Sequence, residues 1–377
     1  MPDNRNRAWL QQAAIVGCVL VCLASSAFAQ DAPTPSQAIE RGVAFLAQEV
    51  PAWAADHNCY SCHNNSNAAQ ALYRAKALGH EVAPHATADT TDWLLHPGRW
   101  KDNGGDPAFA DETLANIQFA AALVTAVESD VFADADCESQ QQVDQPVQDK
   151  SAMAAVQEAA ALIAADQQAD GFWRIGGETQ IGTPATLGNT LATREALRTL
   201  RMAEMDQFAA PITKAEAWLF EQRPQTVFDA AAQLLALADA RASGARKEGD
   251  SNSQDSVTQH QMDARKAAIA AAANRALDVV GRGQPPDGGL GPYLVSPPEP
   301  FDTAIVILAL SRWGEDEDRV RILKARDFLL AEQYAEGDWP ETTRPEGNES
   351  YAQRLSTTGW AVLALLEVEQ VQSAKGD

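Results

Sequence analysis

Two cysteines and a histidine lie close together in the segment Cys59-Tyr60-Ser61-Cys62-His63. Two thiols at this spacing can add to the two vinyl groups of a haem, and a histidine that follows directly can supply a nitrogen to the iron. The same thiols could instead form a redox pair or half of a zinc site, unless their spacing is accidental. Each of these chemistries needs a different surrounding sequence.

The rest of the chain favours the haem. A zinc site needs two further ligands, and neither a second Cys-x-x-Cys nor a pair of histidines follows, with only His57 nearby. A thioredoxin-like pair needs a preceding strand and a βαβ context, and no strand pattern occurs. We therefore predict covalent haem c, with Cys59 and Cys62 as attachment residues and His63 as an iron ligand.

The first residues predict export. Two arginines precede an apolar run over residues 13–23, and small residues end at Ala29, which is the layout of a cleaved signal peptide. We expect residues 1–29 to be removed and residues 30–377 to form a periplasmic or otherwise exported protein. The apolar run is short for a membrane span, so an uncleaved leader is the only membrane attachment expected.

Cysteine content and charge restrict the class of protein further. Three cysteines remain after the leader, too few for a disulfide framework, and Cys137 is left open as a buried thiol or a dimer link. The net charge of −23 argues against nucleic acid and anionic lipid as partners. It would attract a basic periplasmic redox partner, although acidity serves solubility alone in many exported proteins.

A frame of Gln, Gly and Trp repeats along the chain. It has the form Gln-x3-Gly-x-Trp at Gln167–Trp173 and at Gln333–Trp339, and a third copy keeps Gln284 and Gly288 but has leucine in place of Trp. A weaker copy contains Gln222. Successive copies lie about 50 to 60 residues apart, which leaves room for two helices in each repeat.

Apolar residues that recur every three or four positions predict twelve helices and no strand. Six have a charged face and are expected to lie outside: residues 35–49, 86–96, 150–168, 210–222, 264–283 and 319–333. Their partners are apolar nearly all round and must be buried: residues 64–79, 111–129, 187–204, 227–243, 300–313 and 354–369. The polar stretch 243–263 is expected to be a solvated linker. The sequence therefore predicts an all-α double ring of six helical hairpins.

This pattern resembles the α/α-toroid superfamily of squalene-hopene cyclases and protein prenyltransferase β subunits. The resemblance rests on the Gln and Trp frame, the six hairpins and the Asp302-Thr303-Ala304 start of a buried helix, and it covers nearly all of residues 30–377. In that family the Gln and Trp tie the end of an outer helix to its neighbour, so the resemblance implies that they are structural. It also makes an isoprenoid-like molecule a candidate ligand for the toroid cavity.

The catalytic motifs of that family do not carry over. The cyclases protonate an alkene with the middle acid of an Asp-x-Asp-Asp motif, whereas this chain has Glu-Pro-Phe-Asp-Thr-Ala at residues 299–304. The prenyltransferase zinc set of Asp, Cys and His also fails, because no Cys or His follows His260. We therefore do not expect a functional terpene cyclase, and the shared fold does not change that expectation.

Topology places the haem motif at one rim of the ring, where the chain passes from an outer to an inner helix. Arg99 and Arg174 lie in connections of the same type and are candidates to pair with haem propionates, while Trp100 is a candidate for packing beside the macrocycle or in the core. His96 is the candidate sixth iron ligand, because the methionines after the leader fall on or near the opposite rim. The alternatives are an open iron, water, Lys101 or a tyrosine such as Tyr351.

Two functions from different classes remain. The chain is either a periplasmic electron-transfer protein or haem-dependent oxidoreductase, or a toroid scaffold that binds a protein or lipid and uses the haem as a sensor or structural pin. The sequence leaves open whether it is an enzyme, and fixes neither the substrate or redox partner nor the oligomeric state.

Overall fold

The computed structural model describes residues 33–104, 111–132, 152–176, 181–250, 256–342, 344 and 350–375, without the side chains of residues 245–259. The expected leader and Cys137 lie outside these ranges. Within them the chain forms helices and irregular connections and no strand. No helix in this part is both long and apolar enough to cross a membrane.

Six helices with an exposed face make up the outer layer, as their charged faces predict. They are α2 (Pro35–His57), α4 (Ala88–Leu94), α7 (Ala152–Ala165), α9 (Ala209–Glu221), α11 (Ser256–Gly283) and α13 (Arg319–Glu332). Short helical turns lead into three of them: η2 (Pro84–Ala86), η6 (Asp206–Phe208) and η7 (Asp316–Asp318). In α13 only Ala325, Leu329 and Leu330 are buried, which is the narrow apolar stripe of an outer helix.

Six further helices form the inner layer. They are α3 (Ala69–Ala77) with the π-helical turn η1 (His63–Ala68) before it, α5 (Glu112–Glu128), α8 (Gly188–Met202), α10 (Val227–Asp250), α12 (Pro300–Trp313) and α14 (Tyr351–Lys375). Every residue of α12 except Arg312 is buried. A helix that is apolar on all sides is stable only when it is buried in the core. The predicted division into inner and outer helices is therefore confirmed.

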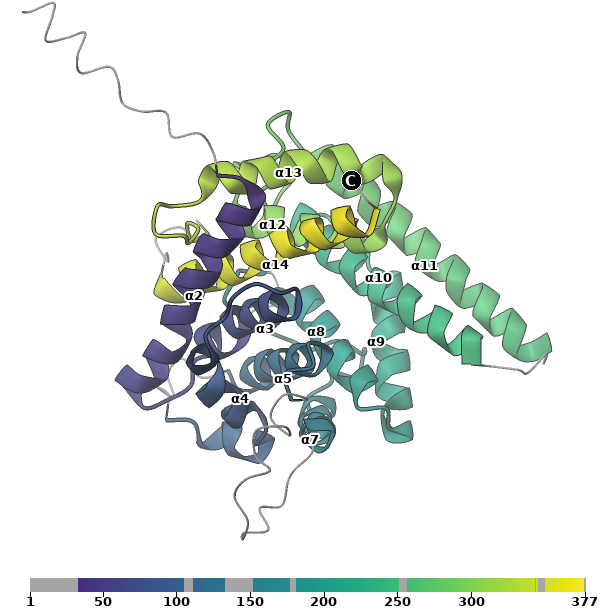
Figure 1. The fold of residues 1–377 in the computed structure, drawn as a ribbon. Coiled ribbons are helices and arrows are strands. Elements are labelled where there is room, and N and C mark those ends of the chain that lie inside the picture. The colour runs from purple at the N-terminus through teal and green to yellow at the C-terminus, as the bar shows by residue number, and fades with distance from the viewer. Residues whose placement is uncertain are drawn as a thin grey trace, which may run out of the picture. The chain divides into compact units, whose positions relative to one another are not determined.

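One predicted connection is wrong. The stretch 243–263 is not mainly a linker, because α10 continues to Asp250 and α11 begins at Ser256. These two helices extend side by side as a long hairpin (Figure 1). Alanine, arginine, lysine and glutamine favour the helix intrinsically, so each helix propagates past the end of its apolar face.

The inner helices form a closed ring. Each contacts the next, in the order α3, α5, α8, α10, α12 and α14, and α14 contacts α3 in turn. Figure 1 shows α14 lying between α12 and α3. Closure covers the apolar sides of the first and last helices, which an open row of hairpins would expose to water.

The repeated Gln and Trp side chains join successive outer helices. Gln167 follows α7, and its Nε2 donates to the carbonyl of Gly171 at 2.8 Å and to that of Pro211 in α9 at 2.9 Å. Trp173 donates its Nε1 hydrogen to the carbonyl of Ile163 at 2.8 Å. The glutamine therefore links α7 to α9, and the tryptophan closes the end of α7.

The last repeat closes the outer ring in the same way. Gln333 donates to the carbonyl of Gly337 at 2.8 Å and to that of Ala38 in α2 at 2.9 Å. Its Oε1 accepts a hydrogen bond from Arg41 at 2.6 Å. The final outer helix is thereby tied to the first, which confirms the structural role that the resemblance implies for Gln and Trp.

The inner helices run parallel around the ring. Near their starts, the Ser66 hydroxyl donates to the carbonyl of Gln118 at 2.5 Å, and Asn67 donates to Ser356 at 3.2 Å. Near their ends, Arg198 of α8 pairs with Glu128 of α5 at 2.7 Å. We call the edge where the inner helices begin the N-terminal rim and the edge where they end the C-terminal rim.

Candidate functional site

The Cys59–His63 segment lies at the N-terminal rim, between α2 and η1. α2 ends at His57, and Asn58 takes a left-handed conformation (φ 51°) that turns the chain out of the helix. Ser61 then starts the next helical turn: its hydroxyl accepts the His63 N–H at 3.0 Å, and its own N–H donates to Oδ1 of Asn65 at 2.8 Å. These bonds fix the backbone that carries both thiols.

The connection of the second hairpin holds this segment in place. Asn103 follows η3 (Pro97–Asp102); its Oδ1 accepts the Tyr60 N–H at 2.9 Å and its Nδ2 donates to the Tyr60 carbonyl at 2.5 Å. The Tyr60 ring stacks on Trp93 of α4 with centroids 4.4 Å apart. Sequence reasoning found neither Asn103 nor Trp93, because a clamp across 43 residues leaves no local signal.

Burial keeps the Cys62 thiol and the His63 imidazole neutral. Cys59 and Cys62 are unbridged and partly exposed. Desolvation raises the pKa of Cys62 to about 12, so its thiol is protonated at neutral pH. Desolvation lowers the pKa of His63 to about 4, so its imidazole is neutral there. The Nδ1 atom of His63 is buried and has no hydrogen-bond partner.

These residues fit a haem, except that the histidine lacks the hydrogen-bond acceptor that an iron ligand usually has. Two unbridged thiols three residues apart and a neutral imidazole are the groups that covalent attachment and iron ligation use. An iron-bound histidine usually donates its other ring N–H to a carbonyl or carboxylate, and Nδ1 of His63 lacks such an acceptor. In the described ranges, no three His, Cys, Asp or Glu side chains converge as a metal-binding group.

Two of the other predicted site residues share this corner. Arg99 lies 5.7 Å from the centroid of the Trp93 ring, on which Tyr60 stacks. Trp100 is buried, donates its Nε1 hydrogen to the Trp93 carbonyl at 3.3 Å and packs 5.5 Å from Phe119. Of the two roles considered for Trp100, the structure therefore favours core packing.

His96 and Arg174 occupy different surroundings. His96 is partly exposed just after α4, and its Nδ1 is 2.7 Å from the Asp92 carbonyl; when Nδ1 carries the proton, Nε2 keeps its lone pair. Arg174 lies over the Phe172 ring at 5.4 Å, and that ring stacks on Trp218 of α9. These contacts place Arg174 in the third hairpin, whereas the Cys59–His63 segment belongs to the first.

The last inner helix meets the first hairpin beside the motif. Asn64 donates to the Tyr351 hydroxyl at 2.8 Å, and that hydroxyl donates to Glu49 at 2.7 Å. Trp53 stacks between His57, at 3.9 Å, and Tyr351, at 5.7 Å. Burial and the nearby Glu49 carboxylate raise the pKa of Tyr351, which keeps the phenol protonated and a poor iron ligand.

The loop before α8 covers the mouth of the ring at the N-terminal rim. Side chains from three separate elements donate to carbonyls of this loop: Asn67 to Pro184 at 3.1 Å, Gln118 to Ala185 at 3.0 Å, and Arg344 to Gly182 at 2.9 Å. The backbone of residues 182–185 therefore lies across the starts of the inner helices.

An ion pair occupies the segment Glu299–Ala304, which differs in sequence from the acidic motif of the cyclases. Arg344 donates to both carboxylate oxygens of Asp302, at 2.6 and 2.8 Å, and to Glu299 at 3.1 Å. Burial raises the pKa of Asp302 to about 6 and Arg344 opposes that rise, so this carboxyl is ionised at neutral pH. Thr303 is structural, since its hydroxyl accepts the Leu290 N–H at 2.8 Å.

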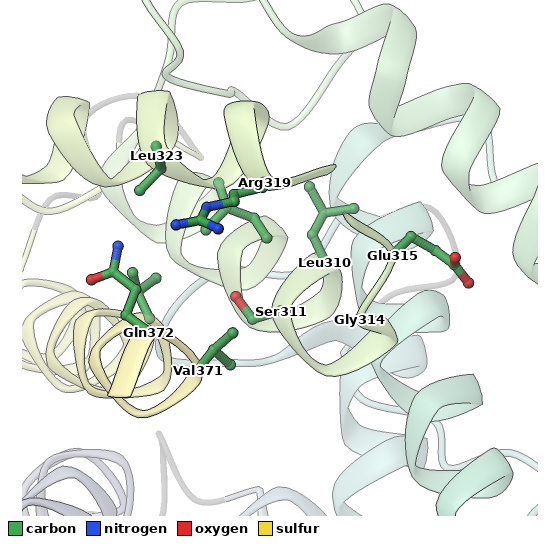
Figure 2. A pocket seen from close by; sticks show the side chains of 10 residues that line it. Leu310, Ser311, Gly314, Glu315, Arg319, Leu323, Val371 and Gln372 are labelled. Carbon is green, nitrogen blue, oxygen red and sulfur yellow. The ribbon is translucent and has the colours of Figure 1, made fainter. Parts of the chain in front are cut away.

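A narrow pocket of about 50 Å³ opens between the ends of α12, α13 and α14. Figure 2 shows Leu310, Leu323 and Val371 around it, with Arg319 and Gln372 at one side and Glu315 pointing away. The lining is mainly apolar, and its volume suits a few water molecules rather than an isoprenoid.

Comparison with known proteins supports the fold. No family model and no curated protein matches the chain. Among solved structures it is similar to a protein from Actinoplanes, with 16% identity, a TM-score of 0.52 and coverage of 89% of this chain and 100% of that one. It is also similar to a variant of the type II terpene cyclase MstE from Scytonema, in complex with the substrate geranylgeranyl dihydroxybenzoate, with 13% identity, a TM-score of 0.50 and coverage of 89% and 98%. The predicted α/α toroid is confirmed, and these likenesses extend to the fold alone.

Proposed function

We propose that this chain is an exported toroid protein that carries covalent haem at Cys59 and Cys62 and serves periplasmic electron transfer or oxidoreduction, with His63 as an iron ligand. The observation that carries the proposal is the pair of unbridged, partly exposed thiols beside a partly exposed, neutral imidazole. Haem, when bound, supplies one-electron redox chemistry.

The attachment residues are suited to addition without any change of oxidation state. Each thiol would add across one vinyl group, so that a carbon–sulfur bond forms and the thiol hydrogen moves to the other vinyl carbon. The Asn103 clamp on Tyr60 would hold the two sulfurs at a fixed spacing during this addition. The stacked Tyr60 and Trp93 rings would form an apolar border to the site.

The imidazoles would have distinct roles. His63 would bind iron through Nε2, because its Nδ1 is buried in the protein. His96, with Nδ1 directed at the Asp92 carbonyl, would be the candidate for a second iron ligand. Arg99 beside Trp93 would donate charge-assisted hydrogen bonds to a propionate of the haem.

Likeness to a terpene cyclase does not lead us to propose cyclisation. Alkene protonation needs a strongly acidic carboxyl group that is protonated, whereas Asp302 is held as a carboxylate by Arg344. Phe301 stands at the place of the middle acid, directly before Asp302. Its ring packs on Phe228 and Trp360, so an apolar contact replaces the proton donor.

The test is expression with the native leader in a bacterium that performs cytochrome c maturation. We expect a coloured protein whose haem stays with the denatured chain, and a proteolytic peptide spanning residues 59–63 that gains the mass of one haem. Cys59→Ser and Cys62→Ser should each lose one of the two thioether bonds. Cys137→Ser is the matched control and should retain full attachment.

The contrary result is equally clear. If a folded, exported chain is colourless, and both Cys59 and Cys62 react with an alkylating reagent after denaturation, the haem proposal is wrong. Circular dichroism of the same sample establishes that the chain is folded, so the outcome does not depend on an unfolded product.

A further inference from the structure

Charged side chains gather at the C-terminal rim, far from the haem motif along the inner helices. All six inner helices contribute to this cluster: Arg74 from α3, Glu128 from α5, Arg194, Glu195 and Arg198 from α8, Asp239 from α10, Arg312 from α12, and Glu367 from α14. Guanidinium and carboxylate groups are equal in number, so the cluster as a whole carries no net charge.

In the part of the cluster between α8, α10 and α5, every charged side chain pairs with an opposite charge, although the Nη2 atom of Arg194 is buried without a hydrogen-bond partner. Arg194 donates to Asp239 at 2.7 Å and also to Glu195. Arg198 bridges Glu195 at 2.8 Å and Glu128 at 2.7 Å. Burial opposes the ionisation of Asp239, but Arg194 and Arg312 outweigh it and lower the pKa of Asp239. These groups are charged at neutral pH and hold one another in place.

The part between α3, α12 and α14 is incompletely paired. Within the described chain, the guanidinium of Arg74 is hydrogen-bonded to the amide of Gln370 and to no carboxylate. Glu367 pairs with Arg312 through one oxygen, at 3.3 Å, and no donor among the described residues reaches its other oxygen. The Ser311 hydroxyl is buried without any hydrogen-bond partner. Buried polar groups normally have partners, so the Ser311 hydroxyl calls for an external one. Arg74 and Glu367 are partly exposed, and their remaining hydrogen-bonding positions are open to a solute.

These incompletely paired groups line one cavity. It has a volume of about 420 Å³ and is bounded by Arg74, Asp239, Ser311, Arg312 and Glu367 together with Ala238 and Ala242. It is open to solvent on one side and is large enough to receive a small metabolite. We call this cavity the basin.

A solute from water can enter the ring more easily at the basin than at the N-terminal rim. At the N-terminal rim, three side-chain hydrogen bonds hold residues 182–185 across the starts of the inner helices. At the C-terminal rim, Arg312 and Glu367 are partly exposed, with 33% and 12% of their side-chain surface open to solvent. A small polar solute can therefore reach the basin directly from water.

We propose that the basin binds a zwitterionic metabolite of the α-amino-acid class. Arg74 would receive the carboxylate through its unoccupied N–H groups, and Glu367 would accept the ammonium group. A zwitterion leaves the net charge of the cluster at zero. A simple anion would be repelled by Asp239 and Glu367, and a simple cation would be repelled by Arg74 and Arg312. The inference is independent of the haem.

The test uses the full exported chain, with or without haem, and isothermal titration calorimetry with each common L-α-amino acid. We expect saturable binding of at least one of them. Its analogue without the amino group and its analogue without the carboxyl group should each bind at least tenfold more weakly, because each retains only half of the charge match.

Variants locate the site. Arg74→Gln and Glu367→Gln should each weaken the binding of that amino acid by about tenfold or more, since each removes one charge-assisted contact. Arg282→Gln and Asp278→Asn are matched controls, because these residues form an exposed pair on α11, and they should leave affinity unchanged. Far-ultraviolet circular dichroism checks that every variant is folded.

Three outcomes overturn the proposal. The first is that no amino acid binds saturably to the folded chain. The second is that one of the half-charged analogues binds as tightly as the amino acid, which would indicate a simple anion or cation site. The third is that Arg74→Gln and Glu367→Gln bind the amino acid as tightly as the unmodified chain does, which would place the ligand elsewhere.

Discussion

Replacement of Gln333 by leucine tests whether the repeat glutamines stabilise the toroid by closing it. The substitution removes the hydrogen bonds from Nε2 to the Ala38 and Gly337 carbonyls and the bond that Oε1 accepts from Arg41. Two neutral bonds contribute about 1 kcal/mol each and a charge-assisted one about 1.5 kcal/mol. We therefore expect the free energy of unfolding to fall by about 3 to 4 kcal/mol.

Gln222→Leu is the matched control. The Gln222 side chain donates only to the Trp218 carbonyl of its own helix, at 3.2 Å, so its loss should cost about 1 kcal/mol or less. The two variants share the same chemical change and differ in whether the amide reaches a neighbouring helix. A difference of about 2 to 3 kcal/mol between them thus measures the link across the ring.

Urea unfolding followed by circular dichroism gives both free energies, provided that the slope with urea is unchanged. Hydrogen exchange supplies a local readout: in Gln333→Leu, the amides at the start of α2 should lose protection before those of the inner helices. Equal destabilisation by Gln333→Leu and Gln222→Leu, with no selective loss of protection in α2, would refute the reasoning.

Three further predictions follow from single sites. Gly337→Ala should destabilise the fold by more than about 2 kcal/mol, because φ is +101° and a Cβ would lie 2.4 Å from a backbone oxygen of α2. Gly314→Ala, with φ +79° and no neighbouring atom nearer than 3.9 Å to the Cβ, should cost about 1 kcal/mol. Thermal unfolding of both variants checks this difference. Arg344→Met should destabilise the fold by about 3 to 5 kcal/mol, because it leaves the buried carboxylate of Asp302 unpaired. Adding Asp302→Asn should recover part of this loss. Urea unfolding of the single and double variants measures both effects. In the haem-free protein the pKa of His63 is lowered from 6.5 to about 4, so the unfolded chain binds more protons than the folded chain between these pH values. The contribution of His63 to the free energy of unfolding should be complete above pH 6.5 and fall by about 3 kcal/mol on acidification to pH 4. If the difference in stability between this protein and His63→Gln does not change with pH over that range, the prediction is wrong.

The candidate haem site was only partly visible in the sequence. Cys59, Cys62 and His63 are adjacent, so their spacing alone indicated the chemistry. The Tyr60 clamp involves Asn103, which reaches the motif only after a whole hairpin has folded. Trp100 was a candidate for contact with haem or for the core, and only its packing against Phe119 distinguishes the two roles.

The charged basin had no sequence signal at all. Arginine and glutamate near the ends of helices ordinarily mark a solvated face, and Arg74 and Glu367 are separated by nearly the whole chain. They come together because α14 packs against α3 and closes the ring. The same closure brings Gln333 of the last outer helix to Ala38 of the first.

The sequence by itself determined the helices, their division into inner and outer layers and the repeat that links them. These features depend on apolar periodicity and on motifs a few residues long, which each segment carries independently of the others. The tertiary structure decided which side chains meet: Arg344 with Asp302, Asn103 with Tyr60, and the partly unpaired Arg74 with Gln370. Such contacts depend on the rotation of each helix about its axis and on its register along the ring, and those are fixed only when all the helices pack together.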